Sequence, residues 1–310
     1  MMEKLLRLLP ILVLTAFAHA QGESKNGFNL TDALVPVSEI QSGGPPRDGI
    51  PAIDRPRFVQ PEAAGFVQPG DRVLGIARNG IAKAYPVAIL NWHEIVNDAF
   101  ADEPIAVTYC PLCGTGIAYL ASNKGRVMRF GVSGLLYNSD MLLYDRQTES
   151  LWSQIGKHAI SGPMKGTRLQ AIPLQHTTWA DWRDRYPDTL VLSTDTGHAR
   201  DYSRSPYSGY EITSDVFFPV SNHDTRYHSK ESVLGVEIDG RFKAYPFVEL
   251  EKSDGRVRDQ LGGRTVTVTY DRRHRTADAV DDDGNPLPAM IAYWFAWYAF
   301  HPDTAVYRAP

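Results

Sequence analysis

Two stretches of the chain repeat each other, and this repeat constrains the fold more than any other feature. The segments "VLGIARNGIAKAYPVAIL" (73–90) and "VLGVEIDGRFKAYPFVEL" (233–250) align without a gap at an offset of 160 residues, with nine of eighteen positions identical. Each segment places a turn signal, Asn79-Gly80 or Asp239-Gly240, between two strand-like runs, which predicts a β-hairpin. A proline follows each hairpin, where it suits the first turn of a helix.

Two further matches extend the repeat. The tripeptide "VTY" occurs at 107–109 and again at 268–270, and a Trp-x-x-Trp pattern followed by Pro-Asp-Thr-x-Val occurs at 179–191 and at 294–306. The longer pattern predicts a helix, a turn and a strand in each copy. We therefore expect an α+β, β-rich fold in which two related halves, each a copy of one hairpin–helix–strand unit, pack as one globular body.

The repeat also sets the expected organisation of the chain. We expect a signal peptide at 1–20, an N-terminal extension at 21–65, a first half at 66–225 and a shorter second half at 226–310. The candidate site residues described below all fall in the first half.

The first twenty residues are typical of a secretory signal. Lys4 and Arg7 precede an apolar run that ends at Ala18, and "AHA" (18–20) is a small-residue cleavage pattern. The alternative is an N-terminal membrane anchor, but the apolar run is short for a bilayer span. We expect cleavage near Ala20 and an exported protein, periplasmic or extracellular, with no transmembrane span.

The charge balance excludes one class of partner. The formal net charge is −4 and no cluster of basic residues stands out, so we expect no nucleic acid partner. Apolar residues make up 43% of the chain, as in ordinary folded domains. The expected partner is an unknown small molecule or another exported protein.

The only two cysteines, Cys110 and Cys113, lie together in "TYCPLCGTG" (108–116). A disulfide between them would close a very short loop and stabilise the fold by about 2 kcal/mol at best, so a structural staple explains the pair poorly. Two interpretations stay open, a thiol-exchange pair and a metal-binding knuckle. The next segment, 116–122, is predicted to be a strand, whereas thioredoxin-like pairs precede a helix, and this favours the knuckle.

The second copy lacks the candidate ligands of the first. The segment "YCPLCG" (109–114) becomes "YDRRHR" (270–275), so neither cysteine is kept, and His93 has no counterpart. Helical spacing from Ile89 to Phe100 predicts that His93 points inward from a helix. A shared site would explain why these three residues are lost together.

We therefore predict that His93, Cys110 and Cys113 bind one metal ion. Two thiolates and an imidazole suit zinc, or copper in a soft site. The alternative for His93 is a buried histidine whose hydrogen bonds are satisfied within the fold. The candidates for a fourth ligand or a general base are Glu94, Asp98, Asp140, Asp145, His158 and His176.

The connection after the cysteines holds the remaining candidates. In "FGVSGLLYNSDMLLYDRQTESLWSQ" (130–154), strand-like runs are followed by a polar, turn-rich piece. One interpretation is a wall over the cysteines that turns Asp140, Asp145, Glu149, Ser150 and Trp152 toward a pocket. The other is a hairpin with a capping turn at 148–150 and a buried tryptophan. The candidate catalytic residues are Glu94, Asp140, Asp145 and Glu149.

Four motifs together resemble the domain-of-unknown-function 3179 family, whose members are exported proteins found mainly in prokaryotes. These motifs are "HEIVND" (93–98), "VTYCPLCGTG" (107–116), the segment 130–154 and "FHPDTAVY" (300–307). The resemblance covers nearly all of the chain after the signal but implies no activity. It implies that the signature segments hold His93, Glu94, Asp98, Cys110, Cys113, Asp140, Asp145, Glu149, Ser150 and Trp152.

The function expected from these residues is that of an exported metal-binding protein, a copper or zinc metalloenzyme or a redox protein. One alternative is a metal-free thiol–disulfide protein, with Cys110 as the attacking and Cys113 as the resolving thiol. Another is a non-catalytic module that binds a glycan or a peptide. The role of His93 distinguishes the metal-binding protein from the thiol–disulfide protein, because only the predicted metal site needs His93 as a ligand.

Overall fold

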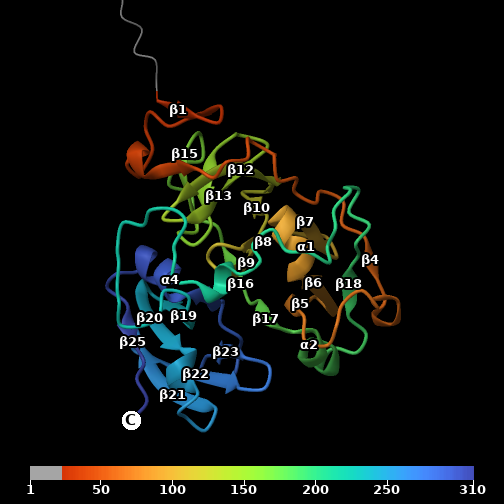
Figure 1. Ribbon diagram of the computed structural model, residues 1–310, viewed down its shortest axis with the longest axis vertical. Coiled ribbons are helices and arrows are strands. Elements are labelled where there is room, and N and C mark those ends of the chain that lie inside the picture. The colour runs from red at the N-terminus through yellow and green to blue at the C-terminus, as the bar shows by residue number, and fades with distance from the viewer. Residues whose placement is uncertain (1–22) are drawn as a thin grey trace, which may run out of the picture.

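The protein is mostly β-structure, in a computed structural model that describes residues 23–310 (Figure 1). Strands hold 41% of the residues and helices 12%, and five small sheets are arranged as in a five-bladed β-propeller. The expected α+β fold of two halves built from a hairpin–helix–strand unit is therefore wrong. The helices are single short segments between strands and form no layer of their own, so the sheets alone set the architecture.

The helices and strands of the described residues group as follows. The α-helices are α1 (Val87–His93), α2 (Trp179–Arg185), α3 (Phe247–Leu250) and α4 (Trp294–Phe300), and the 3₁₀-helices are η1 (Val37–Glu39), η2 (Pro61–Ala63) and η3 (Tyr210–Ile212). The first two sheets, in spatial order, are β17 (Gln175–Thr178), β5 (Arg72–Arg78), β6 (Ile81–Pro86), β18 (Leu190–Leu192), β4 (Phe58–Val59), and then β16 (Ala171–Ile172), β9 (Thr115–Leu120), β8 (Glu103–Cys110), β7 (Ile95–Phe100).

The remaining three main sheets carry the rest. They are β15 (His158–Ser161), β14 (Leu151–Ser153), β13 (Asp140–Asp145), β12 (Phe130–Tyr137), β3 (Ile40–Ser42); then β24 (Met290–Tyr293), β19 (Ser232–Ile238), β20 (Arg241–Pro246), β25 (Ala305–Val306); and last β21 (Arg256–Leu261), β22 (Arg264–Asp271), β23 (Thr276–Val280). Two small hairpins, β1 (Ser24–Lys25) with β2 (Phe28–Asn29) and β10 (Ser122–Asn123) with β11 (Arg126–Val127), complete the strands.

The repeated sequence segments form two sheets with the same plan. In each sheet the predicted hairpin, β5–β6 or β19–β20, pairs with one antiparallel strand on one side and with a parallel strand on the other. Each copy also contributes a three-stranded core to a second sheet, β7–β8–β9 or β21–β22–β23. A copy therefore spans two sheets, which is why the sequence repeat did not reveal the five-sheet arrangement.

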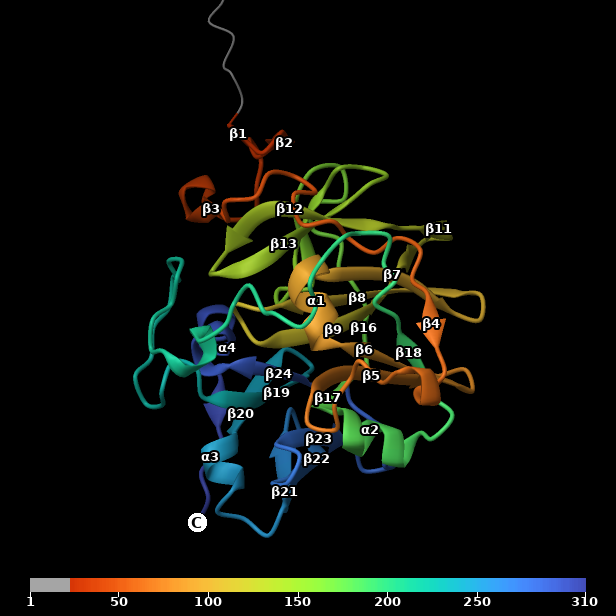
Figure 2. The same ribbon diagram turned by 45° about the vertical axis from the view of Figure 1, so that its right-hand side comes forward.

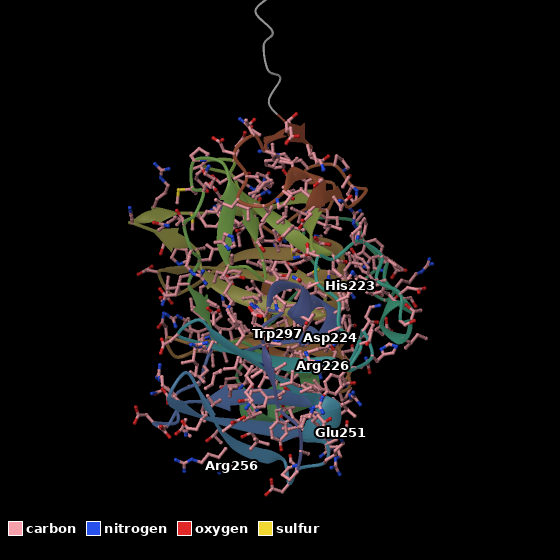
Figure 3. All side chains as sticks on the ribbon, turned by 90° about the vertical axis from the view of Figure 1, so that its left-hand side faces the viewer. His223, Asp224, Arg226, Glu251, Arg256 and Trp297 are labelled. Carbon is pink, nitrogen blue, oxygen red and sulfur yellow. The ribbon has the colours of Figure 1, made fainter. Side chains whose placement is uncertain are left out.

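Shared motifs pack alike in both copies. Gly75 lies against the Trp182 ring and Gly235 against the Trp297 ring, each so closely that a Cβ atom would overlap the indole. Trp182 Nε1 donates to Thr189 Oγ1 at 2.8 Å, and Trp297 makes the equivalent bond to Thr304 at 2.9 Å. Figure 3 labels Trp297, which belongs to α4. The Val-Leu-Gly, Trp-x-x-Trp and Pro-Asp-Thr motifs are thus parts of the fold.

The helix predicted to reach Phe100 is shorter than expected. It ends at His93, because Glu94 adopts a left-handed conformation with φ 58° and strand β7 begins at Ile95. A residue in this conformation stops a helix, and the β-branched pair that follows it favours a strand. His93 is nevertheless fully buried, as predicted.

Residues 193–231 connect β18 to β19 and contain one short 3₁₀-helix, η3; we call this segment the strap. Figure 2 shows the strap, in blue-green, passing in front of α1 and continuing to α4. Most of its side chains are exposed or half-buried, and the buried ones are Tyr210, Val220 and Lys230. A segment with so few buried side chains is held by a small number of contacts.

The strap is fixed to the body at several points. Near its start, the Trp92 indole nitrogen donates to the Arg204 carbonyl at 2.9 Å. Near its end, Trp294 Nε1 donates to Asp224 Oδ1 at 3.2 Å, and the Arg226 guanidinium lies over the Trp294 ring. Figure 3 labels Asp224 and Arg226. The strap therefore lies across the first copy and ends on a helix of the second.

Among residues 23–310, no helix combines the length and the apolar character that crossing a bilayer requires. The predicted signal peptide lies outside the described residues.

Candidate metal centre

Both cysteines lie in the turn that joins two buried strands. Cys110 is the last residue of β8, Cys113 precedes β9, and the Cys113 amide donates to the Cys110 carbonyl at 3.2 Å. Gly114 follows with φ 60° and lies against the Tyr293 ring, so a side chain at this position would be both strained and blocked. The predicted strand–turn–strand context is confirmed. Both thiols are buried and no disulfide joins them.

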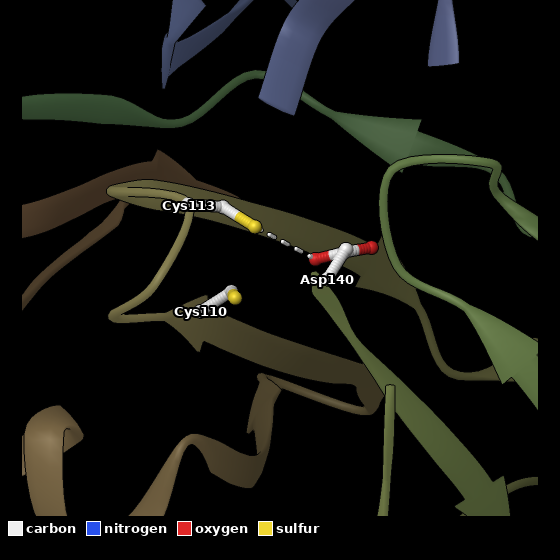
Figure 4. Close-up of side chains that lie close together, drawn as sticks. All are labelled: Cys110, Cys113 and Asp140. Carbon is white, nitrogen blue, oxygen red and sulfur yellow. Dashed lines mark hydrogen bonds between the residues drawn. The ribbon is translucent and has the colours of Figure 1, made fainter. Parts of the chain in front are cut away.

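A third ligating side chain, that of Asp140, reaches the cysteines from a different sheet. Asn138 and Ser139, both with positive φ, form the tight turn between β12 and β13 and place Asp140 at the start of β13. The Cys113 thiol donates to Asp140 Oδ1 at 3.6 Å (Figure 4). The ligand atoms of Cys110, Cys113 and Asp140 all lie within 4.8 Å of one another, and all three residues are buried.

The backbone next to Asp140 adds one oxygen atom beside the thiols. The Ser139 carbonyl accepts from the Cys113 thiol at 3.4 Å and from the Cys110 thiol at 4.0 Å. The Ser139 hydroxyl is buried and has no hydrogen-bond partner among the described residues. On the other side of the carboxyl, the Ile155 amide donates to Asp140 Oδ2 at 2.9 Å. The Asp140 carboxyl is thus held in place by a backbone amide.

Burial makes every acid in this region hard to ionise. Burial raises the pKa of Asp140 to about 7, although hydrogen bonds from the Ile155 amide and the Cys113 thiol oppose the shift. Burial also raises the pKa of the Cys110 thiol, and it raises that of Cys113 well above its usual range, with a further rise from the nearby Cys110. Without a cation, the protonated forms are therefore favoured.

Glu94 is a second buried carboxyl near the group. Burial raises the pKa of Glu94 to about 7, the Tyr207 hydrogen bond opposes this, and the charge of Asp140 adds to it. Its charge in turn raises the pKa of Cys110. The Tyr207 hydroxyl of the strap donates to Glu94 Oε1 at 3.2 Å. Within the part of the chain that the structure describes, neither Glu94 nor Asp140 takes part in an ion pair.

His93 is not brought into the group formed by the cysteines. Its Nδ1 is bonded to the Pro51 carbonyl and its Nε2 to the Tyr202 hydroxyl, both at 2.7 Å. Burial lowers its pKa to about 4, so the ring is neutral near pH 7. With both nitrogens engaged, the arrangement matches the alternative stated for this residue, a buried histidine satisfied within the fold.

Two candidate residues of segment 130–154 make contacts that stabilise the hairpin of this segment and do not reach the cysteines. Asp145 accepts hydrogen bonds from the Thr148 amide at 2.7 Å and from Trp152 Nε1 at 2.9 Å. Glu149 is exposed and pairs with Arg47 at 2.7 Å. The capping-turn interpretation therefore describes this stretch, and Asp140 is the candidate that reaches the cysteines.

The other candidate ligands also lie outside the group formed by the cysteines. Asp98 accepts from Lys83 Nζ at 2.8 Å and from the Tyr85 hydroxyl at 2.6 Å. His158 is bonded to the Gly156 carbonyl at 2.7 Å. His176 lies edge-on to the Tyr109 ring with centroids 6.0 Å apart, outside the group formed by the thiols.

The strap was not singled out from the sequence, although it covers the site. Tyr210 is buried in the same cluster as both cysteines, and Tyr207 packs against that cluster. Both residues stand in a segment without periodic apolar spacing, so no pattern in the sequence pointed to them. The site is consequently closed to solvent on the strap side.

The second copy has its own group of ligating side chains at the equivalent turn. Asp271 and His274, which align with the two cysteines, lie within 4.8 Å of Asp181, and all three are half-buried. These side chains already have partners: His274 Nδ1 is bonded to Thr178 Oγ1 at 2.6 Å, and Asp181 is paired with Arg185. A guanidinium on one carboxylate disfavours a metal ion there.

Comparison with known proteins identifies the family. No curated protein and no solved structure matches the chain. The family described as "Protein of unknown function (DUF3179)" matches residues 47–304, which is most of the chain. This agrees with the resemblance carried by the four sequence motifs. The chain belongs to the DUF3179 family.

Proposed function

We propose that this protein binds one metal ion through Cys110, Cys113 and Asp140. The observation that carries the proposal is a buried group of two thiols and a carboxyl whose ligand atoms all lie within 4.8 Å of one another. Among residues 23–310, no cationic side chain is paired with this carboxyl. Buried charges in proteins are paired or coordinate metals. A metal ion would supply the missing positive charge and would favour the deprotonated thiols and carboxylate.

The dimensions of the group support this proposal. In a tetrahedral zinc site, a sulfur at about 2.3 Å and an oxygen at about 2.0 Å from the metal lie about 3.5 Å apart. Cys113 Sγ and Asp140 Oδ1 are 3.6 Å apart. These two atoms could therefore bind one metal ion with little movement, and the Cys110 sulfur lies within 4.8 Å of both. With three protein ligands, a fourth coordination position would remain open.

The donor set limits the choice of metal. Two thiolates with one carboxylate suit zinc, and thiolates also bind copper. Three protein ligands with an open fourth position are characteristic of catalytic zinc sites, which supports a metalloenzyme or a metal-dependent redox protein. We keep export, to the periplasm or the exterior, as the proposed location.

Thiol exchange is favoured less. The attacking thiol of such a protein must be accessible and must ionise readily. Cys110 is 1% exposed and Cys113 is fully buried, and burial raises the pKa of both. Neither requirement is met in this conformation, and this counts against a metal-free exchange protein.

Metal analysis of four proteins tests the proposal. We expect about one zinc or copper per chain in the wild type after purification without chelator, and at least a hundredfold weaker binding in Cys113→Ser and in Asp140→Asn. The matched control is the double variant Asp271→Asn, His274→Asn, which alters the equivalent turn of the second copy and should keep the metal. Full stoichiometric metal in Asp140→Asn would contradict the proposed ligand set.

A further inference from the structure

Glu94 occupies a backbone position that ordinarily belongs to glycine. It is the residue after α1, with φ 58°, and its amide donates to the Leu90 carbonyl. Helices commonly end in this left-handed conformation, and glycine is preferred there because a side chain is strained. A glutamate at such a position has a cost that the rest of the structure must offset.

The second copy shows what the fold itself requires at this point. The Tyr109 amide donates to the Glu94 carbonyl at 2.8 Å, and the Tyr270 amide donates to the Gly255 carbonyl at the same distance. Gly255 has φ 89° and precedes β21, as Glu94 precedes β7. Gly255 is therefore the structural equivalent of Glu94. The turn forms with glycine, so the glutamate is not needed to make it.

The side chain of Glu94 adds a second cost, because its carboxyl is buried and the described residues give it no cationic partner. The residue is 6% exposed, and its hydrogen bond comes from the neutral Tyr207 hydroxyl. Backbone strain and a desolvated carboxyl at one residue are characteristic of functional sites. Neither cost is explained by the packing of the turn, since glycine serves in the other copy.

The position of the carboxyl indicates what it does. Its partner Tyr207 packs against the cluster of buried residues that contains Cys110 and Cys113, and the Glu94 carbonyl accepts from the amide of Tyr109, the residue before Cys110. The Glu94 carboxyl itself is not part of the group whose ligand atoms all lie within 4.8 Å of one another. A carboxyl just outside a ligand set can hydrogen-bond to a molecule bound at the open coordination position.

We propose that Glu94 is a positioning residue for the metal site, and that its carboxyl, supported by Tyr207 of the strap, holds a small protic ligand at the fourth coordination position. This inference rests on the proposed function and deepens it. Glu94 would orient a water-sized molecule against Cys110, Cys113 and Asp140. It would also repel small anions from that position whenever it is ionised.

Glu149 offers a matched control in the same chain. It is also a glutamate with positive φ, 59°, but its carboxylate is exposed and pairs with Arg47. The variant Glu149→Gln makes the same chemical change as Glu94→Gln, at a residue with the same backbone conformation. It does so away from the cysteines.

The test uses the full chain loaded with Co²⁺, whose visible absorption reports on its ligands, and azide as a small anionic probe at pH 8. One Co²⁺ per wild-type chain with thiolate charge-transfer absorption establishes the proposed function, and its absence would overturn both proposals. Given that result, we expect Glu94→Gln to bind azide at least tenfold more tightly than the wild type. Glu149→Gln should stay within twofold of the wild type.

A second variant separates positioning from a purely structural role. Glu94→Gly relieves the backbone strain, so the metal-free variant should unfold at the wild-type temperature or above it while also showing the altered azide affinity. If the wild type and Glu94→Gln bind azide with the same affinity, or if neither binds it, the inference is overturned while the proposed function stands. A markedly lower unfolding temperature for Glu94→Gly would also overturn it, because the side chain would then be structural.

Discussion

The turn that carries the cysteines and its counterpart in the second copy share a backbone but differ in chemistry. In the first copy, Cys110 and Cys113 are buried and meet Asp140 from another sheet. In the second copy, Asp271 and His274 are half-buried and are bonded to neighbouring groups of the fold. The comparison teaches that what the copies share maintains the structure, while what only the first copy has is free to serve a function.

The shared part includes a lysine–aspartate pair in each copy. Lys83 pairs with Asp98 where both side chains are less than 10% exposed, and Lys243 pairs with Asp259 at 17% and 19% exposure. Both lysines come from the repeated Lys-Ala-Tyr-Pro motif. The pairs are equivalent in position but differ in burial, and their energetics should differ accordingly.

The largest effect on stability is expected from Lys83→Met. This variant leaves the Asp98 carboxylate buried without its cation, which costs about 3–5 kcal/mol. Lys243→Met should cost less, because water can partly solvate Asp259. Urea unfolding of the two variants measures this difference in the free energy of unfolding. A larger loss for Lys243→Met would contradict the conclusion that the ion pair of the first copy is the more deeply buried one.

A smaller and equal effect is expected at the two glycines that face tryptophans. Gly75→Ala and Gly235→Ala should each destabilise the fold by about 1–3 kcal/mol, since the added methyl group must displace Trp182 or Trp297. Gly70→Ala is the control, because open space surrounds that position. Thermal unfolding gives the comparison. Unequal losses at Gly75 and Gly235 would show that the copies do not share this contact.

The two buried acids of the first copy should make the stability of the metal-free protein depend on pH. Burial raises the pKa of both Asp140 and Glu94 to about 7, so between about pH 4 and pH 7 the folded state holds protons that the unfolded state has lost. The metal-free protein should therefore lose stability as the pH rises through this range. Bound metal should weaken the dependence, because it would stabilise the ionised Asp140.

The matching control is the double variant Asp140→Asn, Glu94→Gln. Burial lowers the pKa of His93 to about 4 and that of His301 to about 3, and these residues give the opposite slope below about pH 6.5. The wild type minus the double variant isolates the two acids. Unfolding temperatures measured from pH 5 to pH 8 test the prediction, and a difference that stays constant with pH would contradict it.

Local features of this chain were predictable from sequence because they depend on neighbouring residues. The hairpins at Asn79-Gly80 and Asp239-Gly240 follow from turn chemistry, and both are confirmed. The strand after the cysteines was also predicted. The prediction of a helix that reaches Phe100 was wrong, because the pattern of apolar residues does not reveal that the backbone of Glu94 adopts the left-handed conformation.

The site itself depends on contacts that the sequence does not display. Asp140 was one of several acidic candidates, and it meets the cysteines only because the turn at Asn138 and Ser139 places one sheet against another. His93 follows the inward spacing that was predicted, yet Pro51 and Tyr202, far away in the sequence, take both of its nitrogens. The five-sheet arrangement likewise follows from tertiary packing.

The smallest effect on metal content is expected at His93. His93→Gln should leave the metal content unchanged, because His93 is not in the ligand group of the cysteines, although the loss of its hydrogen bonds should destabilise the fold by about 1–3 kcal/mol. Metal analysis beside an unfolding curve checks both parts. Loss of the metal from a variant that is still folded would restore the ligand set predicted from the sequence.

The central claim is the ligand set, and X-ray absorption spectroscopy of the zinc-loaded protein tests it most directly. We expect two sulfur neighbours at about 2.3 Å and oxygen neighbours at about 2.0–2.2 Å, without the outer-shell scattering of an imidazole ring. Two sulfurs together with an imidazole would contradict the assignment of Asp140 as the third ligand and point back to His93. A shell without sulfur would contradict a metal site at Cys110 and Cys113 altogether.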